Sequence, residues 1–199
     1  MSKGQDTRER IVDHAFHRAS VVGLEGLSLG ELAAELELSK SGLFAHFRAK
    51  EALQRAVIEH AAERFVARVV TPALSAKRGE PRLRALVDRW LAWGLENEAH
   101  GCFFVGAATE LDDRPGPLRD ALAATQRDWF DTLANAARIA QSEGHFRTDR
   151  EPEQIAFELF ALMLGAHHHG RLLRDRSSLD RARKAVDRIF DDARRPASS

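Results

Sequence analysis

The segment from Ser39 to Lys50, with the sequence SKSGLFAHFRAK, carries hydroxyl, ammonium and guanidinium groups and contains no acidic residue. Its strong bases are Lys40, Arg48 and Lys50. Cations and hydroxyl donors without a competing carboxylate are the groups that contact a phosphate backbone. The segment therefore predicts a surface that binds nucleic acid.

Two short helices are predicted to position this surface. Apolar residues before it recur at i, i+3, i+4 and i+7, the spacing of one helical face. These residues are Leu29, Leu32, Ala33 and Leu36. A break follows at Glu37–Leu38, and Ser39 begins a second helix with its own apolar set. Two helices joined by a turn of about three to four residues form a helix-turn-helix, whose second helix enters the major groove.

The run SKSGLFAHFRAKEAL, from Ser39 to Leu53, resembles the DNA-binding domain of TetR-type repressors, the TetR/AcrR family. The motif match covers only the N-terminal part of the chain, and the helical remainder fits the family in architecture alone. Two residues depart from the family pattern. Glu37 stands where the family usually has the glycine that a left-handed turn favours. Phe44 replaces a tyrosine whose hydroxyl contacts a phosphate, so we expect that contact to be missing.

The resemblance and the helical positions together predict two sets of DNA contacts. Residues at the start and on the outer face of the second helix are candidates for base-edge contacts: Lys40, Ser41, Gly42 and Ala45. Phosphate contacts, which set register without reading sequence, are predicted for Ser28, Ser39, His46 and Lys50. His46 and Lys50 are carried over from the family pattern. The alternative interpretation of all these positions is a solvated helix surface.

Composition sets limits on this interpretation. Lys+Arg and Asp+Glu are both 30, so net charge gives no support for nucleic-acid binding, and the argument depends on where the charges lie. The single cysteine, Cys102, excludes an internal disulfide and is compatible with a reducing compartment. No basic-then-apolar leader and no run of about 18 apolar residues is present, so we expect a cytoplasmic protein without a membrane partner.

The predicted fold class is all-α, because strand patterns are nearly absent. We expect an N-terminal three-helix head with the helix-turn-helix in residues 1–48, joined by a long helix to a C-terminal ligand-sensing and dimerisation body in residues 49–199. Helix boundaries are indicated by N-cap serines, by prolines at first turns and by glycines after last turns. The boundary residues are Ser28, Ser39, Pro81, Pro117, Pro152, Gly23 and Gly144. The helix from Pro81 is expected to end near Glu98.

A second subunit is predicted from the segment 152–173, whose first turns are apolar nearly all round. A helix of this kind must be covered on every side, and a body of this size buries only one side. The family resemblance implies the same, since its last two long helices form a dimer bundle. The interface candidates are Leu159, Met163, Val186, Ile189 and Phe190.

The aromatic residues of the body are first of all core residues. If the body encloses a cavity, as the resemblance implies, its lining would be mostly apolar with few hydrogen-bonding groups. The ligand-binding candidates are Trp90, Trp93, Cys102, Phe103, Phe104, Thr125, Trp129, Leu133 and His167. Such a lining favours a lipophilic effector over a phosphorylated metabolite.

No metal or cofactor is predicted. Consecutive helical residues point about 100° apart, so His167, His168 and His169 cannot converge on one ion without a partner such as Cys102 or His100. Cys102 is a candidate redox or electrophile sensor, but no Lys or Arg lies in the neighbouring segment, which favours a buried structural thiol.

The sequence thus predicts a ligand-responsive DNA-binding transcription regulator, a repressor released from operator DNA by a small apolar effector. The alternative is a helical small-molecule-binding or interaction protein whose head does not read DNA specifically. Glu37 and Phe44 are the residues that keep this alternative open. An enzyme ranks third, because no catalytic constellation can be assembled from the sequence.

Overall fold

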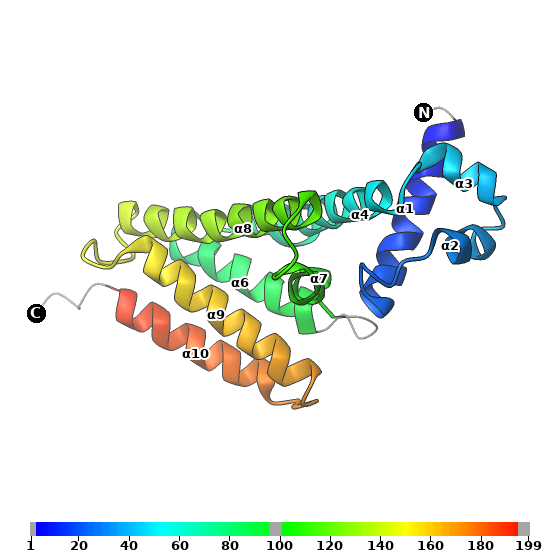
Figure 1. The fold of residues 1–199 in the computed structure, drawn as a ribbon. Coiled ribbons are helices and arrows are strands. Elements are labelled where there is room, and N and C mark those ends of the chain that lie inside the picture. The colour runs from blue at the N-terminus through cyan, green and yellow to red at the C-terminus, as the bar shows by residue number, and fades with distance from the viewer. Residues whose placement is uncertain (1–2, 96–100, 195–199) are drawn as a thin grey trace, which may run out of the picture. The chain divides into compact units, whose positions relative to one another are not determined.

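The computed structural model describes residues 3–95 and 101–194, and all its regular elements within these ranges are helices (Figure 1). The predicted all-α class is confirmed. The expected helix end near Glu98, and His100, lie outside the described residues. None of the helices in the described ranges combines the length and apolar content that a membrane span requires.

The helices follow one another with short connections. They are α1 (Lys3–Val22), α2 (Leu29–Glu35), α3 (Lys40–His46), α4 (Lys50–Phe65), the π-helical turn η1 (Val66–Val70), α5 (Thr71–Ala73), α6 (Glu80–Leu95), α7 (Phe103–Leu111), α8 (Pro117–Ser142), α9 (Pro152–Arg171) and α10 (Ser178–Ala193).

The chain forms two compact units. The head unit comprises Met1–Arg64 and Phe103–Thr125, and the body unit comprises Phe65–Cys102 and Gln126–Ser199. The head unit therefore holds α7 and most of α4 in addition to the three helices expected within residues 1–48. The functional boundary after residue 48 stays a prediction, because packing and function need not divide a chain at the same place.

Side-chain caps define the short helices of the head unit, as predicted. Ser28 Oγ accepts the backbone N–H of Glu31 at 3.4 Å, and Ser39 Oγ accepts that of Gly42 at 3.0 Å. Gly23, with φ of 82°, ends α1. The caps satisfy backbone donors that have no partner within a first helical turn, and they fix where α2 and α3 begin.

The turn between α2 and α3 is a Schellman motif built without glycine. Leu38 donates its N–H to the carbonyl of Ala33 at 2.8 Å, and Glu37 donates to that of Ala34 at 3.2 Å. Glu37 has φ of 57°, so it occupies the left-handed position that such a motif requires. A residue with a Cβ is strained there, yet the turn keeps its geometry.

The long helix that follows the head, which the sequence predicts to run from about Ala49 to Pro72, changes its winding before the proline. The α-helical part ends at Phe65, and η1 fills the interval to Val70 before the single turn α5, with Pro72 inside it. A proline cannot donate an N–H, and its ring clashes with the carbonyl of the residue four places earlier. The wider π turn before Pro72 relieves this conflict between the proline ring and the carbonyl.

The body unit places α9 against both α6 and α10 (Figure 1). Four of the predicted interface residues face inward: Leu159 and Met163 are 0% exposed, Phe190 is 0% and Val186 is 2%. They pack within the subunit, so a partner would meet other faces of these helices; only Ile189 is partly exposed. The free side of α9 carries Phe157, which is 58% exposed.

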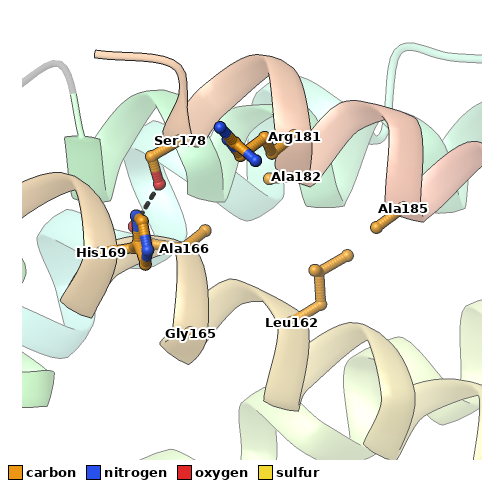
Figure 2. Close-up of a pocket in the computed structure, with 8 residues that line it drawn as sticks. All are labelled: Leu162, Gly165, Ala166, His169, Ser178, Arg181, Ala182 and Ala185. Atoms are coloured by element: carbon orange, nitrogen blue, oxygen red, sulfur yellow. Dashed lines mark hydrogen bonds between the residues drawn. The ribbon is translucent and has the colours of Figure 1, made fainter. Parts of the chain in front are cut away.

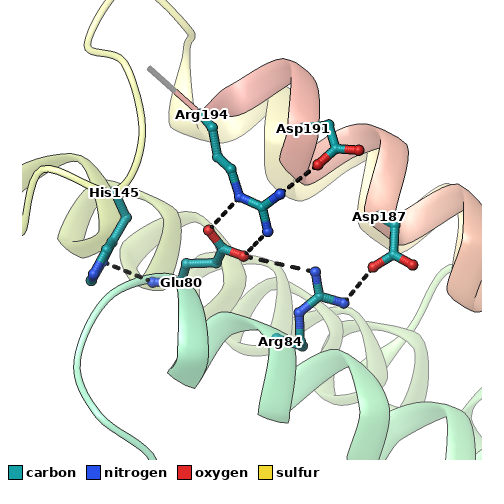
Figure 3. A network of polar contacts seen from close by, with 6 residues as sticks. All are labelled: Glu80, Arg84, His145, Asp187, Asp191 and Arg194. Atoms are coloured by element: carbon teal, nitrogen blue, oxygen red, sulfur yellow. Dashed lines mark hydrogen bonds and ion pairs between the residues drawn. The ribbon is translucent and has the colours of Figure 1, made fainter. Parts of the chain in front are cut away.

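An ion-pair network connects the start of α6 to the end of α10 (Figure 3). Glu80 binds the guanidinium of Arg194, with 2.9 Å between Oε2 and Nε, and lies 3.7 Å from Arg84. Arg84 also pairs with Asp187 at 2.7 Å and covers the ring of Phe190. The hydrogen bond from Arg194 is the main reason that the pKa of Glu80 lies below its ordinary value.

Replacing Glu37 by glycine tests the strain at this turn. Because left-handed geometry at a residue with a Cβ costs about 1–2 kcal/mol, Glu37→Gly should raise the free energy of unfolding by up to about 1 kcal/mol. Urea denaturation followed by circular dichroism measures this change. Ala34→Gly, an exposed helical position in α2, is the matched control and should be destabilised by about 1 kcal/mol. A destabilisation of Glu37→Gly as large as that of the control would contradict the assigned strain.

Candidate nucleic-acid interface and ligand site

The outer face of α3 presents the residues that the sequence nominated for base contacts. Lys40, Ser41 and Ala45 are exposed and Gly42 is partly exposed. Leu43 and Phe47, on the opposite face, are 0% and 2% exposed and anchor the helix in the core of the head unit. The helix therefore has one face fixed by packing and one face free to enter a groove.

Ser28 and Ser39, two phosphate candidates, serve as N-caps through their oxygens. Ser39 Oγ also lies 3.1 Å from Ser41 Oγ. A Cβ at Gly42 would lie 3.0 Å from Ser39 Oγ, so glycine keeps this cap uncrowded. A hydroxyl that accepts a bond still has a hydrogen to donate, so capping and phosphate contact are compatible.

Lys50 and His46 lie at the two sides of the turn that follows α3. His46 is the last residue of α3 and is partly exposed. Lys50 Nζ donates to the carbonyl oxygen of Glu25 in the loop between α1 and α2. An ammonium has three donors, so this contact leaves Lys50 able to reach a phosphate as well.

Arg8 is a cation beside α3 that the sequence analysis missed. Its guanidinium lies 5.0 Å from the centre of the Phe47 ring, directly after α3, and its side chain is exposed. A cation over an aromatic face is held electrostatically. Nothing in the local motif indicates this contact, because Arg8 belongs to α1 and lies far from Phe47 in sequence.

The ligand candidates are divided between the two units. The body unit holds Trp90, Trp93, Cys102, Trp129, Leu133 and His167, and the head unit holds Phe103, Phe104 and Thr125. In the body unit, Phe65 meets Trp93 and Trp129 edge to face, with ring centres 6.1 and 5.0 Å apart. In the head unit, Phe103 meets Phe16 and Phe104, with ring centres 5.6 and 5.5 Å apart. Phe65 and Phe16 were not among the candidates.

Two indole groups of the body unit have unused donors. The Nε1 atoms of Trp93 and Trp129 are buried and find no hydrogen-bond acceptor in the described ranges. A buried donor without an acceptor is costly, and such groups are rare in folded proteins. These N–H groups are therefore suited to an acceptor atom supplied from outside the chain.

His167 connects α9 to the segment before α7. Its Nε2 accepts the backbone N–H of Cys102 at 3.1 Å, which requires the neutral imidazole. Burial lowers the pKa of His167, and the charges of Arg171 and His168 lower it further, so the neutral form is favoured. Cys102 is 3% exposed. This imidazole is thus occupied by a backbone contact.

The other two histidines of the triplet point elsewhere. His168 and His169 are exposed, and His169 Nδ1 lies 3.2 Å from a carboxylate oxygen of Asp175. Within the described ranges, no three His, Cys, Asp or Glu side chains are grouped so that they could hold a metal ion.

A groove of about 330 Å³ lies between α9 and α10 (Figure 2). It is lined by Leu162, Gly165, Ala166, His169, Ser178, Arg181, Ala182 and Ala185. Ser178 Oγ donates to the carbonyl of Ala166 at 2.7 Å across its end. None of the ligand candidates lines this groove, and its small side chains allow close approach of another surface.

Protein-family profiles match both the N-terminal and the C-terminal part of the chain. The profile "Bacterial regulatory proteins, tetR family" matches residues 11–57, and "Tetracyclin repressor-like, C-terminal domain" matches residues 79–186. The HTH-type transcriptional repressor NemR of Escherichia coli K12 is 27% identical over 193 residues, covering 93% of this chain and 94% of NemR.

Solved structures agree over nearly the whole length. A TetR transcriptional regulator from Chloroflexus aurantiacus J-10-FL superposes with a TM-score of 0.89 at 28% identity, covering 98% of this chain and 100% of the other. The reduced form of E. coli NemR superposes with a TM-score of 0.83 at 25% identity, covering 97% and 100%. The similarity extends through the helix-turn-helix and the helical body alike.

Proposed function

Because the chain belongs to the TetR family of bacterial regulatory proteins, we propose that it is a transcriptional repressor that a small effector releases from operator DNA. The observation that carries the proposal is the geometry of α3. This helix is capped, buried on one side and free on the other, and its free side carries Lys40, Ser41 and Ala45.

Of the two residues that favoured a head unable to read DNA, Glu37 and Phe44, only Phe44 still supports this alternative. Glu37 adopts the left-handed geometry that glycine usually provides, so the turn is unchanged by this departure. Phe44, which is 47% exposed, still lacks the tyrosine hydroxyl. The absence of one phosphate contact weakens binding to all sequences alike and leaves base reading intact.

The repressor acts as a homodimer in the cytoplasm. The apolar side of α9 that faces away from the subunit core, formed by Phe157, Ala161 and Leu164, continues into the groove beside α10. An exposed apolar strip of this kind is typical of a subunit interface. Two heads about 34–36 Å apart, or a multiple of this distance, meet successive major-groove faces.

The effector is a lipophilic molecule with one or two hydrogen-bond acceptors. The aromatic cluster of Phe65, Trp93 and Trp129 supplies apolar contact area, and the two buried indole N–H groups supply donors. The effector shifts the population toward a state with lower DNA affinity only as far as it binds that state better. We expect α4 to carry this change toward the head.

Two alanine substitutions test DNA reading. Lys40→Ala should relax discrimination at one base position, and Lys50→Ala should weaken binding to all sequences and reduce the salt slope by about one unit for each phosphate that is no longer neutralised. Duplexes enriched by the wild-type protein from a random library serve as probes in fluorescence anisotropy at several salt concentrations. Lys184→Ala, an exposed cation in α10, is the control and should bind as the wild type does. Unchanged binding by both head variants would refute the assignment of α3.

A charge on the free side of α9 tests dimerisation. Phe157→Glu should give a folded monomer, because a carboxylate in an apolar interface is left without a partner. Leu159→Glu should fail to fold, because it places the charge inside the subunit. Sedimentation velocity and circular dichroism separate these results, and Phe157→Leu is the matched control that keeps the dimer. A wild type that sediments as a monomer at micromolar concentration would contradict the prediction.

Tryptophan fluorescence tests the effector class. All three tryptophans of the chain, Trp90, Trp93 and Trp129, lie in the body unit, so a lipophilic compound bound there should quench their emission. The same compound should release the labelled operator duplex. Trp129→Phe keeps an aromatic ring but removes one donor, and it should weaken compounds that carry a carbonyl oxygen more than hydrocarbons. Release by a sugar phosphate or nucleotide, without response to lipophilic compounds, would contradict this class.

A further inference from the structure

The loop between α1 and α2 is bound by a carboxylate from α7. Glu110 Oε1 accepts the backbone N–H of Leu24 at 3.1 Å, and Oε2 accepts that of Glu25 at 2.8 Å. All three residues belong to the head unit. One side chain thus satisfies two consecutive backbone donors, and charge-assisted bonds of this kind are stronger than neutral ones.

The loop is shaped to admit this carboxylate. Gly23 has φ of +82°, and a Cβ there would lie 2.5 Å from Glu110 Oε1. Only glycine leaves room for the side chain while holding this backbone conformation. The residue that ends α1 therefore also allows Glu110 to approach.

Helix α4 holds the opposite edge of the same two residues. Gln54 Nε2 donates to the carbonyl of Leu24 at 3.0 Å, and Lys50 Nζ donates to that of Glu25. Gln54 is 3% exposed, so its amide is enclosed with its partner. The amide edge of the loop is thus bound by α7 and the carbonyl edge by α4.

This doubly bound loop leads directly into the helix-turn-helix. Ser28, the N-cap of α2, follows it, and α2 packs against α3. Leu24 and Leu27 are 1% and 3% exposed, so the loop is anchored by its apolar side chains as well. A displacement of α7 would therefore move the start of α2 and, with it, the face of α3.

The chain just before α7 is held in turn by α9. Cys102, the residue before Phe103, donates its N–H to His167 within the body unit. The residue that precedes α7 is therefore held by α9, and the last turn of α7 holds the loop through Glu110. A displacement of Cys102 would pass along the backbone into α7.

We propose that Glu110 is a positioning residue for DNA recognition, which couples the position of α7 to that of the recognition helix α3. This inference rests on the proposed function, since it assigns a route, in addition to α4, by which the regulatory state of the body reaches the DNA-reading surface. The coupling is reciprocal, so operator DNA bound at α3 must also alter α7.

Amide hydrogen exchange tests the proposal without any effector. In Glu110→Ala, the Leu24 and Glu25 amides should exchange roughly 10-fold faster, because the substitution removes two charge-assisted bonds. Glu110→Gln keeps the side-chain volume but offers one acceptor oxygen, so it should lie between alanine and wild type. Asp113→Ala removes an exposed carboxylate just after α7 and is the matched control. The full-length protein is used throughout.

The decisive measurement is exchange in α7 with and without the duplex that the wild type enriches from a random library. DNA should slow exchange across residues 103–111 in the wild type and in Asp113→Ala. In Glu110→Ala this response should disappear, and affinity for the duplex should fall by roughly 5-fold or more while non-specific binding is unchanged. A residue that only stabilised the fold would lower the melting temperature and leave the DNA response of α7 in place.

Three results would overturn the inference. Glu110→Gln with wild-type exchange at Leu24 and Glu25 would show that the contact is not made in solution. A retained DNA response of α7 in a folded Glu110 variant would show that the contact carries no coupling. If the wild type enriched no duplex at all, the proposed function itself would be wrong, and the inference with it.

Discussion

A helix of seven residues is too short to be stable alone in water, and both α2 and α3 have this length. Their existence depends on groups outside their own hydrogen-bond ladders. Ser28 and Ser39 satisfy first-turn donors, and the Schellman turn satisfies the last carbonyls of α2. Burial of Leu32 and Leu43 supplies the remaining stabilisation. The DNA-reading surface is therefore a property of the whole head unit, and α3 would not persist as an isolated segment.

The sequence predicted these local features well, because each depends on neighbours within one helical turn. N-cap serines and first-turn prolines are determined by backbone donors and sterics that are nearly the same in every protein. Burial on α9 depends instead on residues that are distant in sequence. The pattern indicated that its apolar residues must be covered, but it could not say which neighbour covers them. Leu159 and Met163 proved to be 0% exposed within one subunit, on a helix that packs against α6 and α10.

Contacts between distant residues set the limit of prediction for the candidate site. Glu110 and Leu24 are separated by 86 positions, and an acid before a Pro-Gly turn resembles any solvated surface carboxylate. The same holds for Arg8 on Phe47 and for Phe65 among the tryptophans. The base-contact candidates lie on the exposed or partly exposed face of α3, and the ligand candidates are divided between the two units, so the roles of both sets stay predictions. The structure adds the residues that contact these candidates.

The zero net charge of the chain is compatible with a DNA-binding head, since several acids of the head are paired internally. Glu35, in the last turn of α2, binds His14 and Arg18 from α1. Asp13 binds Arg64 and His60 from α4. A carboxylate paired at such distances contributes little field beyond about 10 Å, the Debye length near physiological salt. Lys40 and Arg48 lie on a segment, residues 39–50, that contains no acid. Local arrangement, rather than total charge, thus provides the attraction for phosphate, and the pairs that screen the acids also fix α1 against α2 and α4.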